Sequence, residues 1–545
     1  MIKYYGKRVF EGIVIGKIIR LDSELNINNL NFEGYDKELQ KFNIARQKTL
    51  ESYRLIYNNS LNESNEISSD IILSFISLLD DLDFIETVEK YLKTNICAED
   101  AVLRASEELQ EIFINLDNPY LKERAKDIKE ICKKVINNLQ NNKNNFTIDK
   151  PTILITSDML ISDFMELDKK NILGIVFENV SPNSHIAILA RSLSIPSIAS
   201  VSEKIVDNSS NCILDSKNGL FIVDPDKDLL NQYLLLKKER EQLSEQLIKY
   251  KNINVKTVDN KTIKVFANIS SKYEIQTVLD NNADGIGLFR SEFLYLNNHN
   301  FPTEEEQFEH YKEVVSQMKE KPTIIRTMDI GADKKVDYFK LPSESNPFLG
   351  YRGVRIYKEY LNVFIAQLRA LLRASVYGNL KIMIPMINSV DEVKFIKSTI
   401  NDVKNQLSKE KINFNPDLEV GIMIETPAAA LICDELAQYV DFFSIGTNDL
   451  SQYVLAIDRE NSKLVDQYNP NHKAILRLIY HISKIANEHN IKVGICGEIA
   501  REKELLGFFI NCGIEELSVS SSYILECKKN IADIDTNNYL IKKFI

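Results

Sequence analysis

The sequence contains no apolar run long enough to form a transmembrane helix, and its first residues contain no signal-peptide core. The sequence has seven cysteines, an odd number, and contains no Cys-x-x-Cys pair. This argues against a disulfide framework and against a zinc site. The six histidines form no His-x-His or His-x-x-x-His pattern. We therefore expect a protein of a reducing, cytoplasmic compartment.

A basic excess is also missing. The chain has 67 Lys and Arg residues against 78 Asp and Glu residues, a net charge of −11, which disfavours non-specific binding to nucleic acid or to an anionic membrane. Its hydrophobic fraction of 44% and charged fraction of 27% are those of an ordinary globular protein. With 545 residues, it is expected to form three or four domains at roughly 150 residues each.

Residues 1–225 change pattern twice. Residues 1–30 read as strands, residues 31–142 have the three- and four-residue apolar spacing of amphipathic helices, and strand-like runs return over residues 143–225. We expect residues 1–30 and 143–225 to form one α/β domain into which the helical segment is inserted.

Residues 226–258 form a charged helical stretch that we interpret as a linker helix, although an outer helix of a domain would have the same pattern. Residues 259–545 contain eight apolar runs, each followed by a helical stretch, which is typical of a (β/α)₈ barrel. A doubly wound open sheet is the alternative. The runs occupy residues 263–269, 284–289, 322–328, 381–387, 418–425, 441–446, 491–497 and 514–520.

Reactive side chains follow several of these runs. A single strand-end arginine, carboxylate or cysteine more often has a structural role, but a barrel would direct the whole set toward one mouth. The set comprises Arg290, Arg326, Glu425, Asn448, Asp449, Arg459 and Cys496.

The chemistry of this set points to an anionic substrate. Arginines would repel one another unless an anion lay between them, and their planar fork suits phosphate or carboxylate. Two carboxylates without a histidine or cysteine pair suit Mg²⁺, and a thiol could act as a general acid or base. We therefore expect a Mg²⁺-dependent enzyme acting on a phosphorylated carboxylic acid.

His185 is an isolated histidine at the start of a helical run over residues 186–193. Ser181 and Pro182 look like an N-cap followed by proline at the first helical position. His185 would then lie in the first turn, where the helix dipole favours a phosphoryl group. A surface histidine without a role is the alternative.

Long motifs in this chain resemble those of Enzyme I of the bacterial phosphotransferase system, within the phosphoenolpyruvate-utilising enzymes. The resemblance covers nearly the whole chain. Related dikinases and synthases carry an additional ATP-binding domain, whereas this sequence contains no glycine-rich nucleotide loop. The matching strings include SHIAILARSLSIPSIAS, DGIGLFRSEFLYL, IIRTMDIGADK, GIMIETPAA, SIGTNDLSQYVLAIDREN and VGICGE.

The resemblance implies a role for each candidate residue. His185 would take the phosphoryl group from phosphoenolpyruvate, and Cys496 would protonate the enolate to give pyruvate. Substrate binding would fall to Arg290, Arg326, Asn448, Asp449 and Arg459, and the Mg²⁺ ligands would be Glu425 and Asp449.

It also implies partners and a division into domains. The phosphoryl group would pass to a histidine of the phosphocarrier protein HPr for sugar uptake, and the chain would form a homodimer through the barrel. A swivelling phosphohistidine domain (1–30 and 143–225) would carry a helical HPr-docking insertion (31–142). A linker helix (226–258) would lead to the phosphoenolpyruvate-binding barrel (259–545).

Two departures from the family pattern keep other interpretations open. The loop before His185 usually reads Gly-Gly-x-Thr-Ser-His, but here residues 180–183 are Val, Ser, Pro and Asn, and Phe75 stands where relatives often carry a histidine. A divergent paralogue with another phosphocarrier, a non-catalytic phosphoenolpyruvate-binding module and an ATP-dependent dikinase are the alternatives. The acidic cluster Asp80, Asp81, Asp83 and Glu86 is either a solvated face or a surface for a basic partner.

Overall fold

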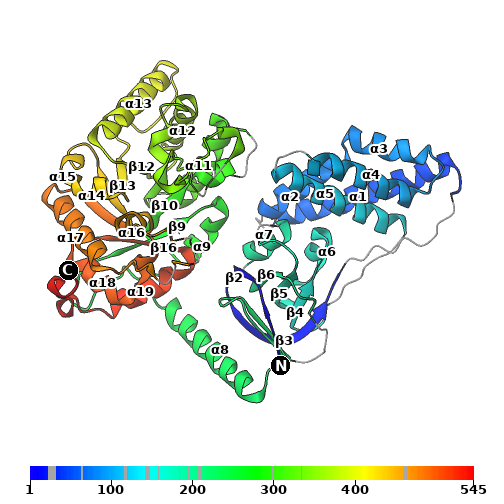
Figure 1. Ribbon diagram of the computed structural model, residues 1–545, viewed down its shortest axis with the longest axis horizontal. Coiled ribbons are helices and arrows are strands. Elements are labelled where there is room, and N and C mark those ends of the chain that lie inside the picture. Colours follow the sequence, from blue (N-terminus) through cyan, green and yellow to red (C-terminus); the bar gives the residue numbers. More distant parts are fainter. Residues whose placement is uncertain are drawn as a thin grey trace. The chain divides into compact units, whose positions relative to one another are not determined.

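The computed structural model divides the chain into two compact units, Met1–Gln242 and Leu243–Ile545. Each unit is described by itself below (Figure 1). The described residues are 1–22, 32–62, 66–115, 119–140, 148–157, 159–182, 184–193, 195–205, 211–296, 300–332, 334, 336–459, 461, 463–464 and 467–545.

The first unit contains an eight-stranded sheet in the order β1-β8-β7-β3-β4-β5-β6-β2. Strand β3 pairs in parallel with β4, so the opening strands and those that follow the helical segment share one sheet, which confirms the predicted insertion. The strands are β1 (Ile2–Tyr5), β2 (Lys7–Phe10), β3 (Ile13–Arg20), β4 (Thr152–Thr156), β5 (Ile172–Glu178), β6 (Ser197–Val201), β7 (Asn211–Asp215) and β8 (Leu220–Val223).

The inserted segment is all-helical. It consists of α1 (Tyr35–Asn62), α2 (Glu66–Leu79), α3 (Leu82–Leu92), α4 (Ala98–Asn115) and α5 (Pro119–Leu139). Proline at the start of α5 suits the first helical position, where no backbone donor is needed.

The helical block and one face of the sheet share a hydrophobic core. Because strand side chains alternate between faces, Leu154 of β4 and Ile175 and Phe177 of β5 join the buried side chains of the helices. The intervening Ile155 and Val176 belong to a second cluster on the other face. The helices are therefore integrated with the sheet rather than attached to it by their ends alone.

Three further helices complete the first unit: α6 (Ile161–Glu166), α7 (His185–Ser192) and α8 (Lys227–Ile248), the last of which crosses the boundary between the units. The predicted cap of α7 is wrong. The backbone N–H of Ser184 donates to Ser181 O (3.1 Å), which closes a turn. The side chain of Ser184 then accepts from Ala187 N, so the helix begins at His185.

The second unit is a closed barrel of eight parallel strands. Helices surround these strands (Figure 1). Each of the eight predicted apolar runs overlaps one strand, and closure of the barrel excludes the open-sheet alternative. The strands are β9 (Lys264–Ile269), β10 (Gly285–Arg290), β11 (Thr323–Arg326), β12 (Leu380–Ile384), β13 (Val420–Ile424), β14 (Phe442–Gly446), β15 (Lys492–Cys496) and β16 (Glu516–Ser520).

Helices follow the barrel strands and cover them. They are α9 (Ile275–Asp280), α10 (Glu292–Leu296), α11 (Glu304–Met318), α12 (Leu361–Ala374), α13 (Val390–Lys409), α14 (Pro427–Leu431), α15 (Cys433–Leu436), α16 (Thr447–Leu455), α17 (Lys473–Glu488), α18 (Lys503–Asn511) and α19 (Ile524–Ala532). Within the described part of the chain, no helix has both the length and the apolar character to span a membrane.

Candidate active site

The barrel brings the predicted strand-end residues to one end. Arg290 and Arg326 are the last residues of β10 and β11, and their Cα atoms are partners in the parallel register. Glu425 directly follows β13, and Cys496 is the last residue of β15. Asn448 and Asp449 lie in the first turn of α16, after β14. This is the carboxyl end of the barrel, where parallel strands present their functional side chains.

Arg326 is buried and surrounded by carboxylates. Its Nη2 donates to Oε1 of Glu292 (3.1 Å) and lies 3.4 Å from Oδ2 of Asp329. Burial alone would lower the pKa of Arg326, but the charges of Glu292, Asp329 and Glu425 outweigh it and raise that pKa. The guanidinium is therefore held charged and oriented inside the barrel mouth.

A second buried arginine, which the strand-end pattern does not single out, lies beside the first. Arg352 donates from Nε to Oδ1 of Asp329 (3.1 Å) and from Nη2 to Oδ2 (2.7 Å). Lys334 also donates to Asp329 Oδ2 (3.0 Å). Burial would raise the pKa of Asp329, but the charges of Arg352, Lys334 and Arg326 keep that pKa well below its usual range. Gly331, at φ 119°, permits this close approach, because a Cβ there would lie 2.6 Å from the Arg352 Cβ.

Glu425 and Asp449 have the properties of ligands for a cation. Burial, followed by the charge of Asp449, raises the pKa of Glu425 to about 8. Oδ1 of Asp449 is buried without a hydrogen-bond partner among the described residues and lies 3.7 Å from Nη1 of Arg352. No group of three or more metal-ligating side chains occurs in the described chain. Two carboxylates suit Mg²⁺, which retains waters and substrate oxygens as its other ligands.

Arg290 and Arg459 provide positive charge at the same end. Neither guanidinium forms an ion pair with any described residue. Arg459 follows α16. Burial of Tyr468 raises the pKa of that residue, and the nearby charge of Arg459 opposes this effect. The Tyr468 hydroxyl donates to the backbone oxygen of Asn448 (3.2 Å), and Oδ1 of Asn448 accepts from Glu498 N (3.1 Å). Arg459 is thus placed near the first turn of α16, which carries Asn448.

Cys496 is buried, with 2% of its surface exposed. Its thiol lies 3.6 Å from the Ile445 oxygen and accepts a hydrogen bond from the Ser444 hydroxyl at 3.3 Å. Burial raises the pKa of the Cys496 thiol above its usual value. The sulfur is therefore a protonated group that could serve as an acid.

His185 lies in the first unit, at the N-terminus of α7. Its Nδ1 is 3.1 Å from Oδ1 of Asp127, a buried carboxylate of α5. Arg191 of the same helix donates from Nε to Val9 O and from Nη2 to Pro182 O, both at 3.1 Å. The imidazole of His185 therefore contacts the inserted helices through Asp127. Arg191 holds the loop that precedes His185 through its hydrogen bond to Pro182.

The altered loop before His185 adopts a conformation without strain at Val180. The left-handed residue is Asn179, with φ 53°, and Val180 has no positive φ. Asparagine tolerates this region far better than a β-branched residue. Asn183 lies outside the described residues. The loss of the family's glycines therefore does not force Val180 into an unfavourable backbone conformation.

Further polar contacts join the helical block to the sheet domain near His185. Lys134 of α5 donates to Asp163 of α6 (2.9 Å), and Glu130 accepts from the backbone N–H of Ile161. Burial raises the pKa of Glu130 to about 8, and the charges of Asp127 and Asp163 add to this effect. The carboxylate nearest to His185 thus lies in an acidic group at the junction of two subdomains.

The acidic cluster of the helical block has structural partners. Asp80 forms ion pairs with Arg46 (3.2 Å) and Arg54 (3.6 Å), and Asp81 caps α3 by accepting from Asp83 N. These contacts give Asp80 and Asp81 a structural role that does not require a second protein. Phe75 packs in the helical core against Tyr53, with ring centroids 5.5 Å apart.

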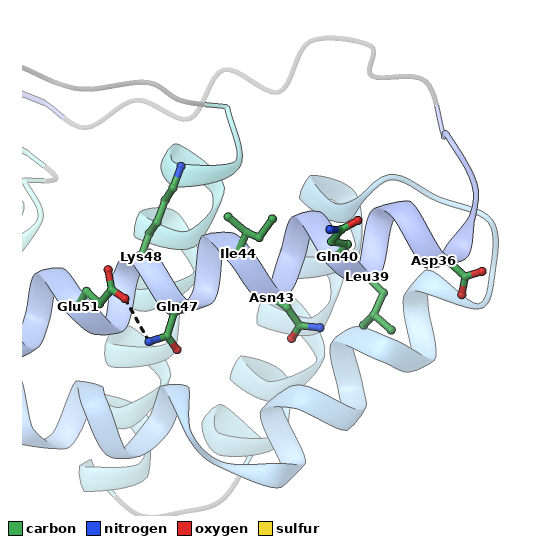
Figure 2. Close-up of a pocket in the computed structure, with 8 residues that line it drawn as sticks. All are labelled: Asp36, Leu39, Gln40, Asn43, Ile44, Gln47, Lys48 and Glu51. Carbon is green, nitrogen blue, oxygen red and sulfur yellow. Dashed lines mark hydrogen bonds between the residues drawn. The ribbon is translucent and has the colours of Figure 1, made fainter.

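A surface hollow runs along α1, and Figure 2 shows its side chains. It is lined by residues of this helix alone, and Gln47 donates to Glu51 across it (3.3 Å). None of the predicted site residues belongs to it, and we assign it no role. Its lining residues are Asp36, Leu39, Gln40, Asn43, Ile44, Gln47, Lys48 and Glu51.

Comparison with known families matches the chain in three parts. Residues 244–536 match "PEP-utilising enzyme, PEP-binding domain", residues 5–124 match "PEP-utilising enzyme, N-terminal", and residues 148–219 match "PEP-utilising enzyme, mobile domain". The largest of these matches covers more than half of the chain and contains the whole barrel mouth described above.

Similar proteins are found along almost the full length. The phosphoenolpyruvate-protein phosphotransferase of Priestia megaterium is 37% identical over 532 residues, which cover 96% of this chain and 92% of that protein. That of Mycoplasma capricolum is 38% identical, with coverages of 96% and 92%, and that of Bacillus subtilis is 36% identical, with coverages of 96% and 93%.

Proposed function

Because this chain belongs to the phosphoenolpyruvate–protein phosphotransferase (Enzyme I) family, we propose that it phosphorylates itself on His185 and passes the phosphoryl group on. The donor is phosphoenolpyruvate, the product is pyruvate, and the acceptor is a histidine of an HPr-type phosphocarrier protein.

The contact between His185 and Asp127 carries this proposal. When Nδ1–H of the imidazole donates to the Asp127 carboxylate, the neutral imidazole carries its lone pair on Nε2, the nitrogen that attacks phosphorus in this proposal. The Nε2–P bond forms as the bond between phosphorus and the enol oxygen breaks, which releases enolpyruvate as its enolate. The first turn of α7 then favours the phosphorylated imidazole, because the helix dipole stabilises negative charge there.

The barrel mouth supports the other half of the reaction. We assign the phosphate and carboxylate of phosphoenolpyruvate to Arg290, Arg326, Asn448, Asp449 and Arg459. The Asp329–Arg352 pair fixes the loops behind Arg326. Glu425 and Asp449 would hold Mg²⁺, which when bound would neutralise charge on the phosphate oxygens.

Cys496 would complete the reaction by donating its proton to C3 of the enolate, so that the C–H bond forms as the S–H bond breaks. A buried, protonated thiol beside the arginines is suited to this step.

We also propose the division of labour along the chain. The sheet domain (1–30 and 143–225) carries the phosphohistidine, and the helical insertion (31–142) docks the phosphocarrier. Residues 226–258 link these parts to the barrel (259–545), through which two chains form a cytoplasmic homodimer.

The proposal is tested by incubating the protein with labelled phosphoenolpyruvate and Mg²⁺. We expect an acid-labile, base-stable label that requires Mg²⁺, disappears in His185→Ala and moves to an added HPr-type carrier. His489→Ala, which changes an exposed histidine at the end of α17, is the matched control. A wild-type protein that stays unlabelled, or a label retained in His185→Ala, would refute the proposal.

A second candidate function is a phosphoenolpyruvate-binding module without phosphoryl transfer. The replaced residues of the loop, Val180, Ser181 and Pro182, favour it. Such a module would bind phosphoenolpyruvate in calorimetry but would never acquire the label. A label that required ATP would instead indicate a dikinase.

A further inference from the structure

Ser444 donates a side-chain hydrogen bond to the sulfur of Cys496. It lies on β14, at an inward-facing position two residues after Phe442. A buried cluster there contains Leu288, Ile324 and Met383 together with Phe442 and Cys496, so apolar side chains pack near the sulfur.

A buried hydroxyl in apolar surroundings is costly unless it forms a hydrogen bond. Ser444 is 5% exposed, and its hydroxyl donates to the Cys496 sulfur at 3.3 Å. The sulfur in turn lies 3.6 Å from the backbone oxygen of Ile445 on the neighbouring strand, which accepts its S–H. The two strands are held in register, with Ser444 opposite Gly494 and Gly446 opposite Cys496. The backbone pairing therefore fixes the distance between hydroxyl and sulfur.

We propose that Ser444 is a positioning residue for Cys496, which orients the thiol and stabilises the thiolate that remains after proton transfer. This inference rests on the proposed function. When C3 of the enolate takes the proton, the C–H bond forms, the S–H bond breaks and the negative charge moves to sulfur. The Ser444 O–H donor keeps its own proton and donates to the charged sulfur, a stronger interaction than with the neutral thiol.

Infrared spectroscopy of the unliganded protein tests the contact without any reaction. The S–H stretching band of Cys496 is obtained as the difference between wild type and Cys496→Ala. We expect Ser444→Ala to move this band to higher frequency, because a sulfur that no longer accepts a hydrogen bond is a weaker donor. Ser444→Thr should leave the band in place. An unchanged band in Ser444→Ala would overturn the inference.

Steady-state kinetics then test the role. We expect Ser444→Ala to lower kcat for pyruvate formation about 10-fold, since a hydrogen bond to a charged group contributes roughly this factor. The KM for phosphoenolpyruvate should change less than about twofold, and Ser444→Thr should restore kcat. In the Cys496→Ala background the same substitution should have no further effect.

Ser483→Ala removes another buried hydroxyl, on α17 and without a hydrogen-bond partner among the described residues, and serves as the matched control. An equal loss in both backgrounds, or a normal kcat in Ser444→Ala, would overturn the inference. A wild-type protein without turnover would refute the proposed function instead, while the infrared result would still decide the contact.

Discussion

Nδ1 of His185 lies 3.1 Å from Oδ1 of Asp127, although the two residues come from different subdomains. His185 begins α7 beside the sheet, and Asp127 belongs to α5 of the inserted helical block. A carboxylate at Nδ1 selects the imidazole tautomer with its lone pair on Nε2. The insertion therefore supplies the carboxylate that contacts the His185 imidazole, and the proposed reaction would use this contact.

We expect Asp127→Asn to slow labelling of His185 by phosphoenolpyruvate about 10- to 100-fold, because a hydrogen bond to a charged group contributes roughly 1.5–3 kcal/mol. Rapid-quench labelling measures this rate. Asp168→Asn, which changes a capping carboxylate elsewhere in the same unit, is the control. Equal rates in wild type and Asp127→Asn would show that the carboxylate does not assist the histidine.

Breaking the buried pair of Arg352 and Asp329 should destabilise the barrel. Arg352→Met leaves the Asp329 carboxylate buried with two of its donors removed, and we expect a loss of about 3–5 kcal/mol in the free energy of unfolding. Chemical denaturation followed by far-UV circular dichroism measures it. Arg477→Met, at an exposed position of α17, should change stability little. Similar midpoints for both variants would contradict the prediction.

The raised pKa of Glu130 predicts a dependence of stability on pH. Between the usual value near 4.5 and the folded value of about 8, the native state retains a proton that the unfolded chain has lost. The contribution of Glu130 to stability therefore falls as the pH rises through this range. Urea denaturation from about pH 5 to about pH 9 should show wild type losing stability relative to Glu130→Gln. Glu107→Gln, on the exposed side of α4, is the control, and its free energy of unfolding should depend on pH as that of wild type does.

The end of α16 offers a stabilising substitution. Ala456 follows the helix at φ 53°, is exposed, and donates its backbone N–H to Gln452 O. Glycine is favoured at this left-handed position, so Ala456→Gly should raise the free energy of unfolding by about 0.5–1 kcal/mol. Ala366→Gly, inside α12, should lower it by a similar amount. A loss of stability in Ala456→Gly would contradict this explanation.

The sequence was sufficient to predict the barrel because each strand is a continuous apolar run followed by a helix, and strand ends carry the reactive groups. Arg290 and Arg326 could be found in this way. Glu292, Asp329 and Arg352 could not, because their role depends on burial and on loops that meet only in the folded barrel. Glu292 and Asp329 do lie two and three residues after the strand-end arginines, a spacing that could have directed attention to them.

The surroundings of His185 were harder to predict. The sequence pattern places the cap at Ser181, whereas the turn closed between Ser181 and Ser184 makes Ser184 the cap, so the helix begins after it. Asp127 gave no local sign, since an acidic residue in an amphipathic helix is ordinarily a solvated one. Its contact with His185 arises from the packing of α5 against the sheet domain.

The core that joins the inserted helices to the sheet has a consequence for how this unit opens. Leu154 and Phe177 of the sheet and Ile131 and Val135 of α5 are buried in the same cluster. Segments that share a core tend to exchange their amide hydrogens through a common opening event. Amides of α4, α5, β4 and β5 should therefore exchange with similar free energies, and a cavity made in the helices would expose the histidine helix to the same fluctuations.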